Sequence, residues 1–267
     1  MHGGLPPITW DQLNKLLHAE PGSRSLLRDV ELPPNLKCSG RLRDADVIGV
    51  VSRGTFISGG ILRAGNILRC SFSRCAFDQL DLRRVHVDAC ACDNVDFSGQ
   101  GHARIDKCVF RSCKFVDTTF KGVSSRFTTF SNCTFSGGSW ADMRWDRCTF
   151  DNVVMTGRLV SSNFKGCTFL KCDMRNATLS DTSFLGSMTG LSLPDRRDNF
   201  VLAPSKLSEA CRLLTGKLTE EGSARLACLA NILGRSAHLE VIDPGLFEEF
   251  SIADRELVMD VLFDLRE

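Results

Sequence analysis

Cysteine and histidine are the residues of this sequence with the most recognisable chemistry, because they act as nucleophiles, redox groups and metal ligands. The 267-residue chain contains 13 cysteines and five histidines. The histidines are dispersed, no pair of CxxC motifs occurs, and the closest cysteine pair, Cys90-Ala-Cys92, has His86 as its nearest histidine. This spacing is weak support for a zinc site. The odd number of cysteines in a chain of this length argues against a disulfide framework.

Motifs that carry catalytic chemistry are also missing from the sequence. It contains no GxxxxGK[ST], no HExxH and no GxGxxG after a strand. Cys211 and Cys228 remain as candidates for a nucleophile, but both fall on or near apolar stripes of expected helices, where core packing is the simpler interpretation. We therefore expect a chain that is not an enzyme and has no cofactor and no metal.

A five-residue repeat explains most of the cysteines. In "CSFSRCAFDQLDL", from Cys70 to Leu82, an apolar residue recurs at every fifth position, a period that fits neither a helix nor an isolated strand. The same step links apolar centres from Leu42 to Phe97, from Phe110 to Met155 and from Phe164 to Phe184. Only two of these 27 centres, Ser52 and Ser125, are polar, so chance does not account for the pattern.

The position two residues before each centre holds a small or compact residue. It contains nine of the 13 cysteines, which we expect to be buried spacers, because free cysteine packs as a small hydrophobe. The centres themselves predict a buried core, whose aromatic members are Phe72, Phe77, Phe110, Phe115, Phe120, Phe130, Phe135, Phe150, Phe164 and Phe169.

The repeat resembles the pentapeptide-repeat family. Units such as "CKFVD", "CTFSG", "CTFDN" and "CDMRN" match the family's usual order of small residue, Asp or Asn, then Leu or Phe, then two polar residues. The resemblance extends over roughly residues 40 to 186. It implies a mainly β fold, a right-handed quadrilateral parallel β-helix in which four units form one square coil. At 20 residues per coil, about seven coils are expected, with strands about 4.8 Å apart.

Both ends of the chain predict helices. Thr9 and Gln12 form a capping box in "TWDQLNKLLHAEP", and residues 205–265 contain several amphipathic helical patterns. We expect an N-terminal helical cap over residues 1–38, the β-helix over 39–193 and a C-terminal α-helical region over 194–267. The repeats carry more Lys and Arg than Asp and no Glu, whereas the C-terminal region is acidic.

Two breaks interrupt the register, at residues 98–109 and 156–163. They are either simple bulges or loops that contact a partner, since loops leaving a regular scaffold often carry function. The candidate partner-binding residues in and beside them are His102, Arg104, Lys107 and Arg158.

The leading hypothesis is a non-catalytic protein-interaction scaffold with a helical tail, which also offers a surface for a homodimer. The family resemblance implies an alternative, a DNA-mimic-like protein that binds a type II topoisomerase such as DNA gyrase and protects it from inhibitors. That role asks for an acidic face, for which Asp78, Asp81, Asp117, Asp151 and Asp181 are candidates. A third hypothesis is a solenoid that binds nucleic acid, which the modest basic excess favours less. The sequence shows no secretory signal and no apolar run of about 18 residues, so a cytoplasmic protein without a membrane partner is expected.

Overall fold

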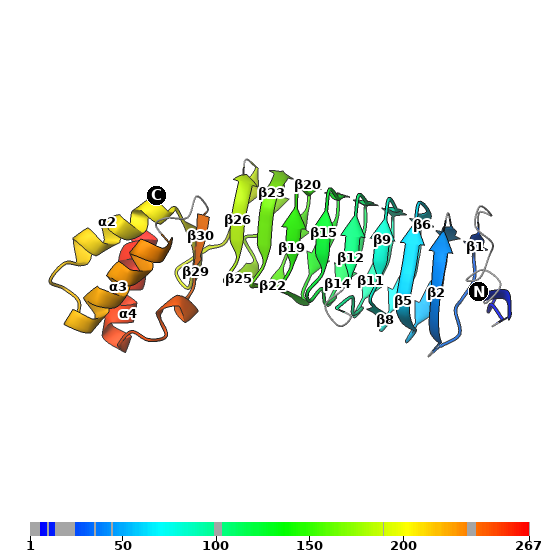
Figure 1. Ribbon diagram of the computed structural model, residues 1–267, viewed down its shortest axis with the longest axis horizontal. Coiled ribbons are helices and arrows are strands. Elements are labelled where there is room, and N and C mark those ends of the chain that lie inside the picture. Colours follow the sequence, from blue (N-terminus) through cyan, green and yellow to red (C-terminus); the bar gives the residue numbers. More distant parts are fainter. Residues whose placement is uncertain are drawn as a thin grey trace.

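The repeats form a stack of four-sided coils of parallel strands, which begins near the N-terminus and ends against a small helical region. The computed structural model describes residues 6–9, 11–13, 25–34, 36–43, 45–98, 103–188, 190–233 and 239–266. Figure 1 shows the coils stacked into a straight rod, here called the tower, with helices α2, α3 and α4 gathered at its C-terminal end.

Each coil has four sides, and we name the four faces after the consecutive strands β8, β9, β10 and β11 of one coil. The β8 face contains the first halves of β2 (Lys37–Arg43) and β5 (Phe56–Arg63), then β8 (Ala76–Asp78), bridges at Asp96 and Thr119, β18 (Ser139–Ala141), β22 (Gly157–Val160) and β25 (Ala177–Ser180). The β9 face contains the second halves of β2 and β5, then β9 (Asp81–Arg83), β12 (Arg104–Asp106), β15 (Ser124–Arg126), β19 (Arg144–Asp146), the first half of β23 (Asn163–Leu170) and β26 (Ser183–Ser187).

The remaining two faces complete each coil. The β10 face contains β1 (Leu26–Arg28), β3 (Asp46–Ile48), β6 (Asn66–Leu68), β10 (His86–Asp88), β13 (Val109–Arg111), β16 (Thr129–Ser131), β20 (Thr149–Asp151) and the second half of β23. The β11 face contains β4 (Val51–Arg53), β7 (Ser71–Ser73), β11 (Ala91–Asp93), β14 (Lys114–Val116), β17 (Thr134–Ser136), β21 (Val154–Met155), β24 (Cys172–Asp173) and β27 (Leu191–Ser192). The predicted parallel β-helix is therefore confirmed, with about eight coils instead of seven.

The extra coil lies at the N-terminal end, before the predicted boundary at residue 39. Leu27 pairs with Val47 in parallel register, and Glu31 bridges to Val51, so stacking already begins at β1. The five-residue step links Leu27 to Leu32 but not Leu32 to the following unit, which hid this coil in the sequence.

Aromatic columns run through the interior of the tower. Phe110, Phe130, Phe150 and Phe169 stack face to face, with ring centroids 4.8, 5.3 and 5.1 Å apart. Trp145 lies in register with the small residue Ser125, so a large side chain is packed next to a small one. Nine of the ten aromatic centres singled out from the sequence are buried, and Phe72 is partly buried.

Phe72, which is partly buried, also lines an apolar cavity. This cavity of about 160 Å³ lies in the N-terminal coils, and Val47, Ile67, Phe72 and Val87 are among the apolar side chains that line it. The aliphatic centres of these coils fill less space than the phenylalanines that continue the same column, which accounts for the cavity.

The spacer cysteines are held in the corners by hydrogen bonds to the backbone. The Cys113 thiol, for example, lies 3.3 Å from the Arg111 carbonyl oxygen, to which it donates. Burial raises the pKa of Cys108 to about 11 and also raises the pKa of Cys92. All nine spacers are buried and form no disulfide, which makes them packing residues.

The two register breaks have different structures. The first adds three residues, because Phe97 is followed by the centre Ile105; residues 99–102 of this insertion lie outside the described residues. The second break removes one residue, because the next inward centre after Met155 is Leu159, four residues later instead of five. Gly157 makes the shortened corner possible, since it has φ +107° and a Cβ there would lie 2.4 Å from the Gly137 oxygen. Residues 157–160 form β22, so the second break is no loop.

The C-terminal region caps the tower and has its own apolar core. It consists of β28 (Asp195–Arg196), β29 (Asn199–Leu202), α2 (Pro204–Leu214), α3 (Glu220–Leu233), β30 (Leu239–Ile242), the 3-10 helix η1 (Pro244–Phe247) and α4 (Ile252–Asp264). Strand β30 pairs antiparallel with β26 and thereby covers the last strand of the β9 face.

Side-chain hydrogen bonds cap the start of three helices. Thr9 and Gln12 form the expected capping box, Thr219 accepts from the Gly222 N–H at the start of α3, and Ser251 accepts from the Asp254 N–H. Ser205 lies within α2, which begins at Pro204 because proline is favoured at the first helical position.

Candidate functional site

The β9 face carries an unbalanced positive charge. In each strand the centre points inward, so its two neighbours and the corner residue that follows point outward. Among the residues whose side chains the structure describes, nine outward positions of this face are basic and three are acidic. The basic residues are Arg63, Arg83, Arg84, Arg104, Lys107, Arg126, Arg144, Arg147 and Lys165, and the acidic ones are Asp81, Asp106 and Asp146.

The other three faces are balanced or slightly acidic by the same count of described side chains. The β10 and β11 faces each hold four basic and four acidic residues, and the β8 face holds two basic and four acidic residues. The excess positive charge of the repeats is thus concentrated on one side of the tower.

Partnering carboxylates neutralise only part of the β9 face. The Arg83 Nε donates to the Asp81 Oδ1 at 2.8 Å, and this contact raises the pKa of Arg83. Arg147 lies 3.8 Å from Asp146. The side chains of Arg104 and Arg144 remain exposed on either side of Ser124.

A surface pocket lies within this face. Its volume is about 280 Å³, and it is lined by Arg63, Ala64, Arg83, Arg84, Asp106 and Lys107. The Oδ1 atom of Asp106 is buried and has no hydrogen-bond partner among the described residues. The pocket therefore combines four cationic side chains with one carboxylate, an arrangement suited to an anion that also carries N–H donors.

Phe127 stands out from the other corner residues. It lies between Lys107 and Arg147 in the corner column, is 41% exposed, and adopts φ +50°. The Arg147 guanidinium carbon lies 5.4 Å from the centre of the Phe127 ring. Among the described non-glycine residues with positive φ, Phe127 is the only aromatic one, and such a conformation is unusual for a bulky residue.

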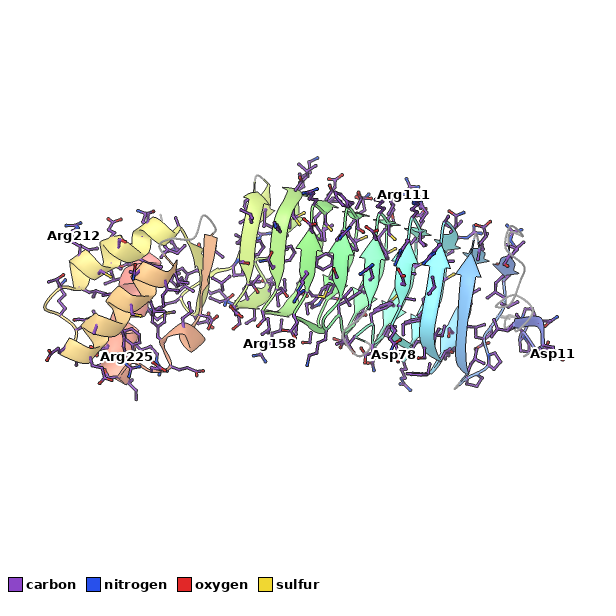
Figure 2. All side chains as sticks on the ribbon, in the orientation of Figure 1. Asp11, Asp78, Arg111, Arg158, Arg212 and Arg225 are labelled. Atoms are coloured by element: carbon purple, nitrogen blue, oxygen red, sulfur yellow. The ribbon has the colours of Figure 1, made fainter. Side chains whose placement is uncertain are left out.

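The structure separates the candidate partner-binding residues. Arg104 lies in β12 and Lys107 at the corner after it, so both belong to the β9 face and to its coils, not to a loop. Arg158 lies in β22 on the β8 face. Figure 2 shows Arg158 and Asp78 at one edge of the tower and Arg111, a β10-face residue, at the opposite edge. His102 lies outside the described residues.

The five candidate residues for an acidic face do not share a face, so that expectation was wrong. Because the repeat distributes them by register, two lie on the β8 face, Asp78 and Asp181, and one lies on each of the others, Asp81, Asp151 and Asp117. Sequence reasoning also missed Arg63, Arg84 and Phe127. Sorting charges at 20-residue offsets would have revealed the two arginines.

Comparison with known proteins identifies the repeat. The family model described as "Pentapeptide repeats (8 copies)" matches residues 158–188. No curated protein matches the chain. Among solved structures, HetL, a pentapeptide repeat protein involved in heterocyst differentiation regulation from the cyanobacterium Nostoc sp. strain PCC 7120, is 11% identical, with 68% of this chain and 95% of that chain covered and a TM-score of 0.36.

Two further solved structures are similar at lower scores. QnrB1, a plasmid-mediated fluoroquinolone resistance protein, is 15% identical, with 64% of this chain and 92% of that chain covered and a TM-score of 0.29. Geobacillus virus E2 ORF18 is 10% identical, with 67% of this chain and 53% of that chain covered and a TM-score of 0.20. The family-model match over residues 158–188 and the five-residue units of the stacked coils confirm the resemblance of the repeats to the pentapeptide-repeat family.

Proposed function

We propose that this chain is a non-catalytic binding scaffold whose β9 face recognises an anionic partner. The observation that carries the proposal is the excess of nine basic over three acidic residues on one face, beside three faces without such an excess. The backbone ladder holds these side chains on a regular frame, so little backbone ordering is needed on binding. A field of one sign along a face also accelerates encounter with an oppositely charged partner.

The cysteines support a binding role more than a catalytic one. Ten of the described cysteines are buried, and burial raises the pKa of Cys92 and Cys108, which disfavours the thiolate needed for nucleophilic attack. The absence of disulfides among the described cysteines agrees with the expected reducing compartment, so a cytoplasmic location is part of this proposal. None of the described helices is long and apolar enough to cross a membrane.

The C-terminal region is proposed as a second contact surface. Ile232 on α3 is 62% exposed and Ile252 on α4 is 74% exposed, although single exposed apolar residues are common. Pairing of two chains through these helices stays a prediction, which sedimentation of the intact chain measures directly.

Topoisomerase protection remains the alternative. A mimic of duplex DNA needs carboxylates in rows along one surface, yet the acidic residues of this tower are spread over four faces and the largest charge excess on any face is positive. We therefore rank this alternative second. If topoisomerase protection is the function, the pull-down described below is expected to recover gyrase or topoisomerase IV subunits.

A pull-down with face-specific charge reversal tests the proposal. The β9-face variant is Arg63→Glu/Arg104→Glu/Arg144→Glu, three exposed residues of one face. The intact chain and the variant are used to capture partners from host lysate, with and without nuclease, at low and high salt. We expect an anionic partner that binds the intact chain, is lost from the variant and dissociates at high salt.

The matched control reverses the same number of charges on another face. Arg53→Glu/Arg74→Glu/Lys114→Glu changes the β11 face and gives the same net charge as the β9-face variant. It is expected to retain the partner. Equal loss from both variants, or equal retention by both, would refute recognition through the β9 face, provided that circular dichroism shows intact β structure.

A further inference from the structure

Resting on the proposed function, we propose that the anionic partner is single-stranded nucleic acid, whose backbone follows the basic β9 face while one base stacks on Phe127. Three separate features of the face carry this inference: the spacing of its cations, the exposed aromatic ring and the pocket beside that ring.

The cations form a straight array along the tower. They extend over six consecutive coils, from Arg63 in β5 to Lys165 in β23, and each step is one strand spacing of about 4.8 Å. The array is therefore about 24 Å long. A linear row of Arg and Lys of this kind can follow several successive phosphates of one strand.

Phe127 gives the array a feature that phosphate binding alone does not require. Its ring is exposed and lies between Lys107 and Arg147 in the corner column. At this position the corner column otherwise has Ala64, Arg84, Lys107, Arg147 and Gly166, so the fold itself does not demand an aromatic residue. A ring with cations on both sides is the pairing that single-strand binding surfaces use, because bases stack on the ring while cations bind phosphates.

The ring also favours an unpaired strand over a duplex. In a duplex both faces of each base are covered by neighbouring bases, so an aromatic side chain on a flat surface has no free base to stack on. An unpaired base offers a free face. An acidic protein surface, in contrast, would gain from the cations but would have no specific use for the ring.

The pocket next to Phe127 adds a site for a nucleotide. Arg63, Arg84 and Lys107 supply donors for phosphate oxygens, while the carboxylate of Asp106, which also lines the pocket, is an acceptor for N–H groups. Base edges carry such N–H donors. Lys107 precedes Phe127 by one coil in the corner column, so the backbone of this pocket residue lies one strand spacing, about 4.8 Å, from that of Phe127 along the tower axis.

The test measures binding of the full chain to fluorescent oligonucleotides by anisotropy. The probes are a mixed-sequence 20-nucleotide DNA, the same sequence as RNA, and the corresponding DNA duplex, each at several salt concentrations. We expect the chain to bind single strands more tightly than the duplex. Comparison of the two single-stranded probes shows whether the chain prefers DNA or RNA.

Phe127→Asn is the decisive variant, because asparagine suits positive φ and keeps the charge unchanged. Loss of stacking is expected to weaken single-strand binding about 5- to 150-fold, with the salt dependence unchanged. Arg84→Gln/Lys107→Gln is expected to flatten the slope of log K against log salt by about 1.4, since two phosphate contacts are removed. Arg53→Gln/Arg74→Gln on the β11 face is the control and is expected to change neither quantity.

The possible failures are distinguishable. If a protein partner is lost from the β9-face variant in nuclease-treated lysate, and no oligonucleotide binds, the proposed function stands and the nucleic-acid inference is wrong. If single strand and duplex bind equally and Phe127→Asn has no effect, the stacking role is wrong. If neither a protein nor an oligonucleotide depends on the β9 face, both proposals fail.

Discussion

Asn199 provides a sharp test of how the tower ends. Its side-chain oxygen accepts from the Leu179 N–H at 3.0 Å, and its side-chain nitrogen donates to the Leu179 carbonyl at 2.6 Å. Asn199 is 2% exposed, so water does not replace these bonds. One carboxamide thereby substitutes for the backbone of a further coil above β25.

Replacing Asn199 by leucine removes both hydrogen bonds and leaves a buried N–H and a buried C=O without partners. Each unsatisfied group costs about 1–3 kcal/mol, which gives an expected loss of about 2–6 kcal/mol in the free energy of unfolding. Urea denaturation followed by circular dichroism measures this loss. Hydrogen exchange locates it, because the Leu179 amide is expected to lose protection.

Asn163→Leu is the matched control for this experiment. Asn163 also hydrogen-bonds across one coil, to the Ser183 hydroxyl at 2.9 Å, but it is exposed, so water replaces the lost bond. The control is expected to change stability by less than about 0.5 kcal/mol. If Asn199→Leu costs less than about 1 kcal/mol and the Leu179 amide stays protected, the capping role assigned to Asn199 is wrong.

Three further predictions concern the interior and the C-terminal region. Val87→Phe extends an aromatic column into the cavity and is expected to raise the free energy of unfolding by about 1 kcal/mol, and with it Tm. Val123→Phe places a ring at a buried site that does not line this cavity and is expected to lower Tm. Equal shifts of Tm in the two variants would contradict the cavity. A thiol reagent is expected to label exposed Cys228 first and the buried tower cysteines only on unfolding, so rapid labelling of the tower would contradict their burial. Hydrogen bonds from Thr219 lower the pKa of Asp254. Since the unfolded pKa is about 3.9, this stabilisation is complete above that pH and is lost as pH falls through the folded pKa. Asp254→Asn should remove that part of the acid dependence of Tm, and an unchanged pH profile would refute the assignment.

The interior of the tower could be predicted because one period governs it. An inward centre every fifth residue and a small residue two positions earlier are both visible in the sequence, and the structure buries Phe110, Phe130 and Cys113 accordingly. Ile105 and Leu159 were missed as centres because an insertion and a deletion of residues lie directly before them. The Asn199 cap was missed because a single side chain that substitutes for a strand leaves no periodic signal.

The candidate site was harder to predict than the interior because charge was summed along all the repeats and not for each face separately. Adding charges along the repeats mixes four faces, and the mixture conceals an excess on one of them. Phe127 was also hidden, since its corner position is polar in the repeat and an aromatic residue there breaks the pattern without shifting the register. A departure from a repeat that does not disturb the fold is a useful signal of function.

The register breaks themselves argue that the β9 face is kept continuous. Between β12 and β15 the paired residues are 20 apart in the sequence, as Arg104 and Ser124 show, but Asp81 and Arg104 are 23 apart and Arg144 and Asn163 are 19 apart. The added and missing residues are therefore taken up away from the β9 strands, and the outward columns run past both breaks without a change of side. Had either break shifted a strand by one residue, the outward side chains of every later coil would have turned inward. Arg63, Arg104 and Arg144 thus lie on one face because the β9 strands stay in register across the first break, and this continuity gives the array the length that a multi-phosphate partner requires.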